Sequence, residues 1–259
     1  MKHKSVKSNI EKLNQFQNLD FQAFKVLAED KTLSPIEKIG FPQQYRKNKE
    51  HIIFEDILGK LTNLSKRKKV VFDIGCGCSD LPKSLIQLCN LNSHKLFLFD
   101  SKEMLSLLPI NNKVNYLEGM FPNDFKSLIQ NSKKKVDVIL CYSVFHYIFN
   151  QQSLYSFFDQ CLSLLAPGGQ FLLGDIPNVS KRKRFFSSQT GIKFHKKFMK
   201  TNKNPKVSHL GIEFEQIDDG IMIGLLARAR NFGYDAYLVP QNSNLPMANR
   251  REDLLIVNP

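Results

Sequence analysis

The stretch that most constrains the fold of this chain is an apolar run that ends in an acid and is followed at once by two glycines. It occupies residues 70–80 and includes Asp73, Gly75 and Gly77. An apolar run of this kind predicts a parallel strand that is buried on both faces. The glycines permit a sharp turn and let a ligand approach the backbone where a side chain would block it. The sequence therefore predicts an open α/β sheet with a ligand site at the carboxyl end of a central strand.

Two classes of cofactor bind at turns of this kind, and the spacing distinguishes them. The dinucleotide motif G-x-G-x-x-G needs a third glycine where Asp80 stands. A carboxylate at a helix start also faces a pyrophosphate poorly, because that position favours anions. The Gly-Lys-Ser/Thr sequence of a phosphate-binding loop does not occur in this stretch. Dinucleotide and nucleoside triphosphate sites are therefore disfavoured.

At this point the chain resembles the class I S-adenosylmethionine-dependent methyltransferases. Their first motif is Asp/Glu-x-Gly-x-Gly-x-Gly, and it follows a hydrophobic strand. Asp73, Gly75 and Gly77 match the motif, whereas Ser79 replaces its third glycine with another small residue. The resemblance assigns these four residues to the cofactor site. On this motif alone, a strand–helix turn without a ligand remains an alternative.

A second apolar run, residues 96–100, ends in Asp100, which follows Gly75 by 25 residues. An acid at such a strand end can accept hydrogen bonds from both ribose hydroxyls. The resemblance assigns this role to Asp100, and the alternative is that it caps the helix that follows. Ser101 begins that helix and belongs to the same predicted site, and Met104 is predicted to lie near the adenine.

The segment 114–122 departs from the family pattern. Many family members have Gly-Asp here, and the Asp binds the adenine amine. Met120 follows Gly119 in this chain, so that contact is in doubt. We expect Met120 and Phe121 to enclose the adenine ring instead.

Two further segments complete the resemblance. Residues 136–142 read as a fourth strand, whose last residues, Cys141 and Tyr142, are predicted to contact cofactor and substrate respectively. Residues 164–173 resemble the family's L-x-P-G-G turn into a fifth strand. Four motifs thus occur in family order over residues 70–175. The resemblance implies a seven-stranded, Rossmann-like methyltransferase sheet, S-adenosylmethionine as cofactor and S-adenosylhomocysteine as product.

The chain divides into a helical extension, residues 1–65, and a methyltransferase domain, residues 66–259, with a basic insertion at about 179–212. Apolar spacing predicts helices in the extension, and N-terminal helices in this superfamily often fold over the cofactor as a lid. Pro42 predicts a non-helical link at 40–46. Tyr45 and Arg46 of this link are either substrate-binding or part of a surface loop.

The last two strands are predicted at 234–240 and 254–257, the second of them antiparallel to the others. The sequence does not decide at which end of the sheet the loop between them emerges.

Net charge and cysteine content bear on the partners and the cellular compartment of the protein. The formal net charge is +13, and lysine exceeds arginine 29 to 8. Because arginine is the usual residue for bidentate phosphate contacts, this excess of lysine argues only weakly for nucleic acid. Five cysteines, an odd number without a C-x-x-C pair, favour a reducing cytoplasm. No apolar run approaches the ~20 residues of a membrane span.

Residues 181–206 carry ten Lys or Arg and no acid. Three interpretations stay open: a solvated basic surface, a phosphate-facing substrate lid, or a patch for nucleic acid or membrane. Lys181 and Arg182 are the predicted substrate contacts of the lid. Four phenylalanines interleave with the charges, and these would serve either base stacking or anchoring of a helix.

His146 is the first candidate for a general base, because it follows the fourth strand and its ordinary pKa suits proton removal near neutrality. A packed, hydrogen-bonded histidine is the alternative. Asp175 and His209 are weaker catalytic candidates. An acceptor that is already anionic would need no base, and the basic residues would then orient it. No metal site is predicted.

The substrate is predicted from size, charge and resemblance. A single domain with a basic segment favours a small anionic or nucleotide- or sugar-linked acceptor. As a whole, the chain resembles methyltransferases of bacterial surface-polysaccharide pathways, those that accompany O-methyl phosphoramidate decoration of capsules. An RNA methyltransferase is one alternative, although the Asn/Asp-Pro-Pro-Tyr/Phe motif is absent after the fourth strand. A non-catalytic, cofactor-binding module is the other.

Overall fold

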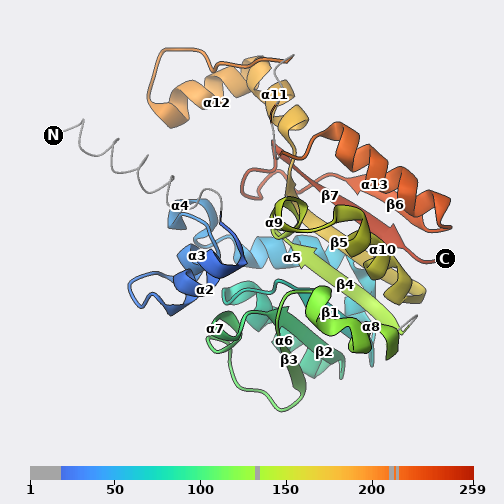
Figure 1. Cartoon of the computed structure of the whole chain (residues 1–259). Helices are drawn as coiled ribbons and strands as arrows, with labels where there is room; N and C mark the ends of the chain where they lie inside the picture. Colours follow the sequence, from blue (N-terminus) through green and yellow to red (C-terminus); the bar gives the residue numbers. More distant parts are fainter. Residues whose placement is uncertain (1–18, 132–134, 210–212, 214–215) are drawn as a thin grey trace.

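The computed structural model describes residues 19–131, 135–209, 213 and 216–259. It contains one seven-stranded sheet of order β3-β2-β1-β4-β5-β7-β6 (Figure 1). Every strand pair outside β7 is parallel, and β7 is antiparallel to β5 and β6. The predicted Rossmann-like methyltransferase fold is therefore confirmed. The strands are β1 (Val70–Ile74), β2 (Lys95–Asp100), β3 (Val114–Glu118), β4 (Val136–Tyr142), β5 (Leu165–Pro177), β6 (Asp235–Val239) and β7 (Arg251–Val257).

Helices cover both faces of the sheet, because the strands present apolar side chains to both sides (Figure 1). In β1, Val71 belongs to one buried cluster and Phe72 to the other, as the alternation of side chains along a strand requires. The helices that supply these clusters are α5 (Glu50–Lys60) and α6 (Asp80–Leu91) on the Val71 side, and α10 (Leu154–Leu164) and α13 (Asp219–Asn231) on the Phe72 side.

Shorter elements connect the strands. They are η1 (Thr62–Ser65), α7 (Lys102–Leu105), η2 (Asn123–Phe125), α8 (Lys126–Asn131) and α9 (Phe145–Gln151). The predicted L-x-P-G-G turn is the start of β5, where the pairing with β4 shifts register between Val136 and Val138. Gly168 there has a φ of +72°, which favours glycine.

From residue 19 on, three short helices precede α5, namely α2 (Phe21–Glu29), α3 (Pro35–Lys38) and α4 (Gln43–Arg46). The expectation of a non-helical link at 40–46 is wrong for its second half. Pro42 sits at the N-cap of α4, before the first helical residue, where its missing N–H costs no helical hydrogen bond. Part of the predicted N-terminal extension, residues 1–18, lies outside the described residues.

The loop between β6 and β7 emerges at the carboxyl edge of the parallel strands. This follows from topology, since β6 is antiparallel to β7 and therefore runs parallel to β5. Gln241 and Arg251, which bound the loop, both bond to Asp175 near the end of β5. The structure thus decides the question that the sequence left open.

The basic insertion forms a hairpin of two helices, α11 (Val179–Ser187) and α12 (Gln189–Met199), which projects beyond the sheet (Figure 1). Phe185 and Phe194 pack edge to face at 5.6 Å between ring centroids. The helices approach closely at Gly191, where an added Cβ would lie 1.9 Å from the carbonyl oxygen of Phe185.

Within the described residues, no helix combines the length and apolarity that crossing a bilayer requires. All five cysteines are buried and unpaired.

The close approach at Gly191 predicts a loss of stability in Gly191→Ala. The new methyl group must displace backbone atoms of α11, which costs about 1–3 kcal/mol. Gly224→Ala, in α13, is the matched control, because its Cβ meets nothing within 4 Å. The control should gain up to about 1 kcal/mol from helix propensity. Denaturant unfolding of both variants measures the difference, and equal changes in the free energy of unfolding would contradict the packing at Gly191.

Candidate active site

A cavity opens at the carboxyl ends of β1, β2 and β4, with about 950 Å³ of empty space including its mouth. Its floor is the turn after β1, and its walls come from the segments that follow β2, β3 and β4. Side chains of the N-terminal helices line it from the other side. The lining residues include Phe21, Phe24, Ile39, Phe41, Arg46, Gly75, Gly77, Ser79, Asp100, Met104, Gly119, Met120, Phe121, Tyr142, Ser143, Val144, Tyr147 and Gln151.

The turn after β1 requires its glycines. Gly75 and Gly77 have φ values of +69° and +66°. A Cβ at Gly75 would lie 2.6 Å from Cγ2 of Val144, and one at Gly77 would lie 2.7 Å from Cγ2 of Ile39. The bare backbone of the turn is therefore enclosed between the segment after β4 and the end of α3.

Asp100 is held at the end of β2 by two backbone amides. Gly77 N–H donates to Oδ2 at 2.8 Å, and Ser101 N–H donates to Oδ1 at 2.7 Å. Each oxygen keeps a lone pair for a further donor. Burial raises the pKa of Asp100 to about 6, although the two amides oppose the shift. The carboxylate can accept two ligand hydroxyls when it is ionised.

Asp73 lies beneath the cavity and does not line it. Burial, together with the nearby Asp100, raises the pKa of Asp73 to about 8. Two other predicted cofactor residues also lie outside the cavity lining. Ser101 caps α7 by accepting from Met104 N–H, and Cys141 is fully buried in the core. The remaining predicted cofactor residues, Gly75, Gly77, Ser79, Asp100, Met104, Met120 and Phe121, all line the cavity.

Met120 and Phe121 are positioned by an acid that sequence reasoning missed. Asp124 accepts from Met120 N–H at 2.7 Å and lies against Gly119, where a Cβ would meet Oδ2 of Asp124 at 2.8 Å. Phe121 packs edge to face on Phe99, with ring centroids 5.1 Å apart. The departure from the family's Gly-Asp pattern therefore gives an apolar wall.

The start of α6 is capped by a side chain from another helix. Glu50 of α5 accepts from Asp80 N–H at 2.6 Å and from Leu81 N–H at 3.0 Å through Oε2. Its Oε1 lies 3.9 Å from Nε of Arg46. Ser79, the N-cap residue of α6, makes no side-chain cap bond itself.

Arg46 is 3% exposed and lines the cavity. Its guanidinium lies over the rings of Phe41, at 4.6 Å, and Tyr142, at 5.8 Å. Within the described part of the chain, its buried Nη2 has no hydrogen-bond partner. An unpartnered, buried guanidinium nitrogen at a cavity wall is suited to a ligand carboxylate.

A second cavity adjoins the first and shares Phe41 and Tyr147 with it. Tyr45, His146, Asn150, Met247 and Arg251 are among its other lining residues. Burial, together with the Arg251 cation, lowers the pKa of His146 to about 3. The imidazole is therefore neutral at physiological pH. Its Nδ1 is buried and finds no hydrogen-bond partner among residues 19–131, 135–209, 213 and 216–259.

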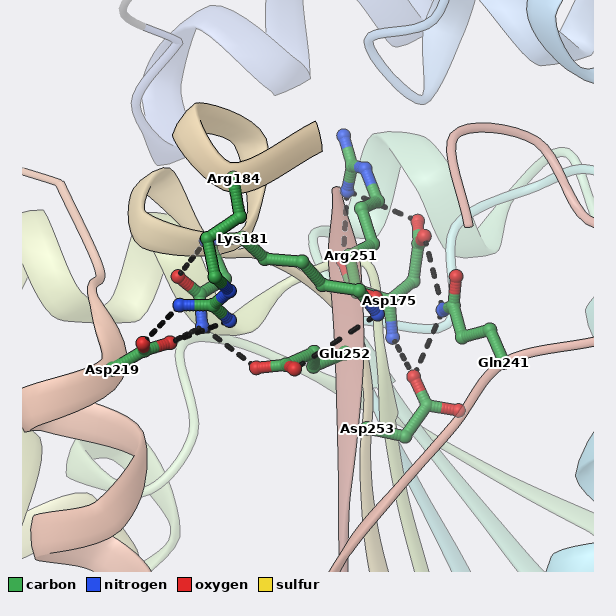
Figure 2. Close-up of polar contacts among 9 residues, drawn as sticks. Asp175, Lys181, Arg184, Asp219, Gln241, Arg251, Glu252 and Asp253 are labelled. Atoms are coloured by element: carbon green, nitrogen blue, oxygen red, sulfur yellow. Dashed lines mark hydrogen bonds and ion pairs between the residues drawn. The ribbon is translucent and has the colours of Figure 1, made fainter. Parts of the chain in front are cut away.

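Asp175 anchors a buried polar network beside these cavities (Figure 2). Its Oδ2 accepts from Ser143 Oγ at 2.5 Å and from Arg251 Nη1 at 3.1 Å, and its carbonyl accepts from the same Nη1 at 2.7 Å. Asp175 and Ser143 have φ values of +57° and +63°, a strained region for residues other than glycine. The carboxylate holds Arg251 and Ser143 in place.

A second acid stabilises the strained backbone of Asp175. Asp253 accepts from Asp175 N–H at 2.7 Å and from Gln241 Nε2 at 2.9 Å through Oδ1 (Figure 2). Its Oδ2 lies 2.7 Å from Nζ of Lys60. This buried ion pair fixes the start of β7, and with it the position of Arg251.

Like Asp73, Ser101, Cys141 and Asp175, three further predicted site residues line neither cavity. Lys181 turns toward β7, where Nζ donates to the carbonyl of Arg251 at 2.7 Å (Figure 2). Arg182 pairs with Glu213 at 2.6 Å. His209 is exposed, with Nε2 3.0 Å from Ser187 Oγ.

Sequence reasoning missed Arg251, Ser143 and Glu50. Ser143 directly follows a predicted strand, which is a usable signal. The sequence predicted Arg251 in a loop and did not decide at which end of the sheet that loop lies. Glu50 caps α6 from a helix that is distant in sequence. Neither residue therefore had a local signal.

With this geometry in hand, comparison with known proteins defines the class. Residues 65–220 match the model of a family described as a methyltransferase domain, and the chain belongs to that family. It is an S-adenosylmethionine-dependent methyltransferase. A search of curated proteins gave no match.

Among solved structures, one similar protein is the plantazolicin methyltransferase BpumL in complex with a monoazolic desmethylPZN analog and SAH. It shows 14% identity and a TM-score of 0.56 over 98% of this chain and 99% of that chain. The CurJ carbon methyltransferase shows 16% identity and a TM-score of 0.54, over 98% of this chain and 70% of that chain. At these identities the likeness concerns the fold.

The first cavity fits S-adenosylmethionine by its own chemistry. Asp100 offers acceptors for ribose hydroxyls, Met120 and Phe121 offer an apolar wall for the adenine, and Arg46 offers an unpartnered cation for the carboxylate. The turn at Gly75 and Gly77, which has no side chains, leaves room for the part of the cofactor that joins the ribose to the amino-acid carboxylate.

The raised pKa of Asp100 predicts that cofactor affinity depends on pH. Below about pH 6 the carboxyl is protonated and accepts hydrogen bonds poorly, so affinity should fall as the pH is lowered from 7.5 to 5. In Asp100→Asn, affinity at pH 7.5 should be at least about 10-fold weaker and should lose this dependence.

Calorimetric titration with S-adenosylhomocysteine measures both effects. Asp137→Asn is the matched control, because Asp137 pairs with Lys69 at the opposite end of the sheet. A wild-type affinity that is the same at pH 5 and 7.5, or an equal loss in the control, would refute the role of Asp100.

Arg46→Met tests the carboxylate site. The variant keeps the apolar length of the side chain and removes the cation. We expect affinity for S-adenosylmethionine to fall about 10- to 100-fold. Affinity for 5′-methylthioadenosine, which lacks the amino-acid end, should change less than about 2-fold, since no charge-assisted bond is lost. Equal losses for both ligands would show that Arg46 only supports the fold.

Proposed function

We propose that this methyltransferase transfers the methyl group to an oxygen of a small anionic acceptor bound in the second cavity. The observation that carries the proposal is that a neutral imidazole and a fixed guanidinium face one cavity, which adjoins the cofactor cavity. His146 supplies the first group and Arg251 the second.

Arg251 supports the preference for an anion. Asp175 engages its Nη1, and Nε and Nη2 have no hydrogen bond within the described ranges. The guanidinium lies 5.6 Å from the Phe41 ring centroid, so it is held between the network and an aromatic wall. A guanidinium whose Nε and Nη2 N–H groups are free suits a phosphate or carboxylate of the acceptor.

His146 supports oxygen as the acceptor atom. A neutral hydroxyl must lose its proton during transfer, and the unpartnered Nδ1 can receive it. The lowered pKa makes the imidazole a weak base, which suffices because the proton leaves as the new bond forms. The bound cofactor supplies an activated sulfonium methyl, so the residues around it chiefly orient the acceptor.

Water is excluded by the rings between the two cavities. Phe24 packs edge to face on Tyr147, with centroids 4.9 Å apart, and Phe41 lines both cavities. These residues come from the N-terminal helices and from α9. This arrangement supports a lid role for the N-terminal helices.

The resemblance to methyltransferases of bacterial surface-polysaccharide pathways remains the basis for proposing a particular acceptor. A phosphoramidate-bearing or nucleotide-linked sugar meets the chemistry of the second cavity, because it joins an anionic group to hydroxyls. We propose this class ahead of acceptors such as the desmethylPZN analog bound to the similar BpumL protein, because Arg251 favours an anion.

His146→Gln is the decisive variant. With phosphorylated sugar acceptors, kcat should fall about 100-fold, while affinity for S-adenosylhomocysteine stays unchanged. Asn150→Ala, which alters the same cavity without removing a base, should lower kcat less than about 5-fold. An unchanged kcat in His146→Gln would refute proton removal by His146.

The pH profile gives a second readout. Because the pKa of His146 is about 3, kcat of the wild type at saturating cofactor should show no acid limb near pH 6.5. Loss of kcat with a midpoint near 6.5 would contradict a buried, neutral His146.

A further inference from the structure

The hairpin of α11 and α12 lies in a strongly basic segment that lines neither cavity. Residues 181–206 contain ten Lys or Arg and no acid. Figure 1 shows the hairpin projecting from the body of the molecule, so α12 presents one side to solvent. The two helices use their charges differently.

The charges of α11 are paired. Arg182 and Lys183 lie 2.6 and 3.1 Å from Glu213, and Lys181 lies 3.9 Å from Glu252. Arg184 pairs with Asp219, the first residue of α13 (Figure 2). These cations fix α11 on the sheet and on α13.

The lysines of α12 are not paired. For Lys193, Lys196 and Lys197, and for Lys200 at the C-cap, no carboxylate lies within 4 Å in the part of the chain that the structure describes. Their spacing of three, four and seven residues places them on one face of the helix. They form a row of four charges about 10 Å long.

Apolar side chains of the same helix are also exposed, and Phe194 and Met199 lie three residues from Lys197 and Lys196, on the two flanks of the row. Phe194, Phe198 and Met199 are 38%, 49% and 48% exposed. Phe194 stacks on Phe198 at 5.7 Å, and Phe198 stacks on Tyr45 at 6.3 Å. Each of these rings therefore has a face against another ring.

This combination distinguishes between two anionic partners. Single-stranded nucleic acid uses open ring faces for base stacking, and arginine is the better residue for phosphate forks. An anionic bilayer needs lysines as point charges and apolar side chains that enter the interface, whatever their orientation. The helix α12 has lysines and exposed apolar side chains, which are the features that an anionic bilayer requires.

We propose that α12 is a membrane-docking surface, with Lys193, Lys196, Lys197 and Lys200 on anionic lipid headgroups and the flanking Phe194 and Met199 in the interface. This goes beyond methyl transfer and does not depend on the proposed acceptor. Since Phe198 stacks on Tyr45, which lines the second cavity, docking places the membrane beside that cavity.

Flotation of the full chain with vesicles tests the proposal. The vesicles are neutral phosphatidylcholine or a 3:1 mixture with phosphatidylglycerol, at about 0.1 M salt. The wild type should partition onto the anionic vesicles only. The triple variant Lys193→Gln, Lys196→Gln, Lys197→Gln should lose on the order of 100-fold in partition coefficient.

The matched control removes the same charge elsewhere. Lys66, Arg67 and Lys68 are exposed, precede β1 and lie at the other end of the sheet. Their triple replacement by Gln should leave partition within about 3-fold of the wild type, because these charges do not face the membrane. Met199→Gln should lower partition about 2- to 10-fold, since one apolar side chain leaves the interface.

Three results would overturn the proposal. The wild type does not bind anionic vesicles, or both triple variants lose binding equally, or α12-dependent binding occurs with an RNA oligonucleotide and not with vesicles. Retained affinity of the α12 variant for S-adenosylhomocysteine verifies that it is folded, and glutamine keeps the helix propensity.

Discussion

The structure depends on the close approach of the backbone after β1 to the end of β2. Gly75 N–H donates to the carbonyl of Phe99 at 2.8 Å, and Gly77 N–H donates to Asp100 at 2.8 Å. The turn thereby continues the pairing of the two strands beyond the sheet. Val144 and Ile39 close over the glycines from opposite sides. A side chain at either glycine would separate these segments and remove the floor of the cofactor cavity.

Buried charge gathers at the same edge of the sheet, and it is arranged so that the carboxylates have partners. Asp253 accepts from the backbone amide of Asp175, both carboxylates accept from Gln241, and Arg251 and Lys60 supply the cations for Asp175 and Asp253 respectively. Burying such charges without partners would cost several kcal/mol per ion. Asp73 differs, because burial raises its pKa to about 8 and favours the protonated carboxyl at neutral pH.

In the proposed function, the two cavities have different tasks. The first is bounded by the turn, Asp100 and Arg46, and its chemistry matches a cofactor that carries hydroxyls, a flat ring and a carboxylate. The second is bounded by His146 and Arg251, and its chemistry matches proton removal and anion binding. The rings of Phe41 and Tyr147 are common to both, so the two cavities share an apolar wall.

The sequence by itself determined the sheet, its class and the floor of the first cavity, because these follow from local patterns. Apolar runs that end in acids and glycines set the strands and the turns, and Asp100 and Gly75 could be named from these strand ends and the family motifs that they resemble. Only the tertiary structure decided the second cavity. Arg251 and His146 meet there because β7 enters the sheet antiparallel beside β5, a long-range pairing without a local signal. The same pairing directs Lys181 to the backbone of β7, whereas the basic segment and the family resemblance had predicted a substrate contact.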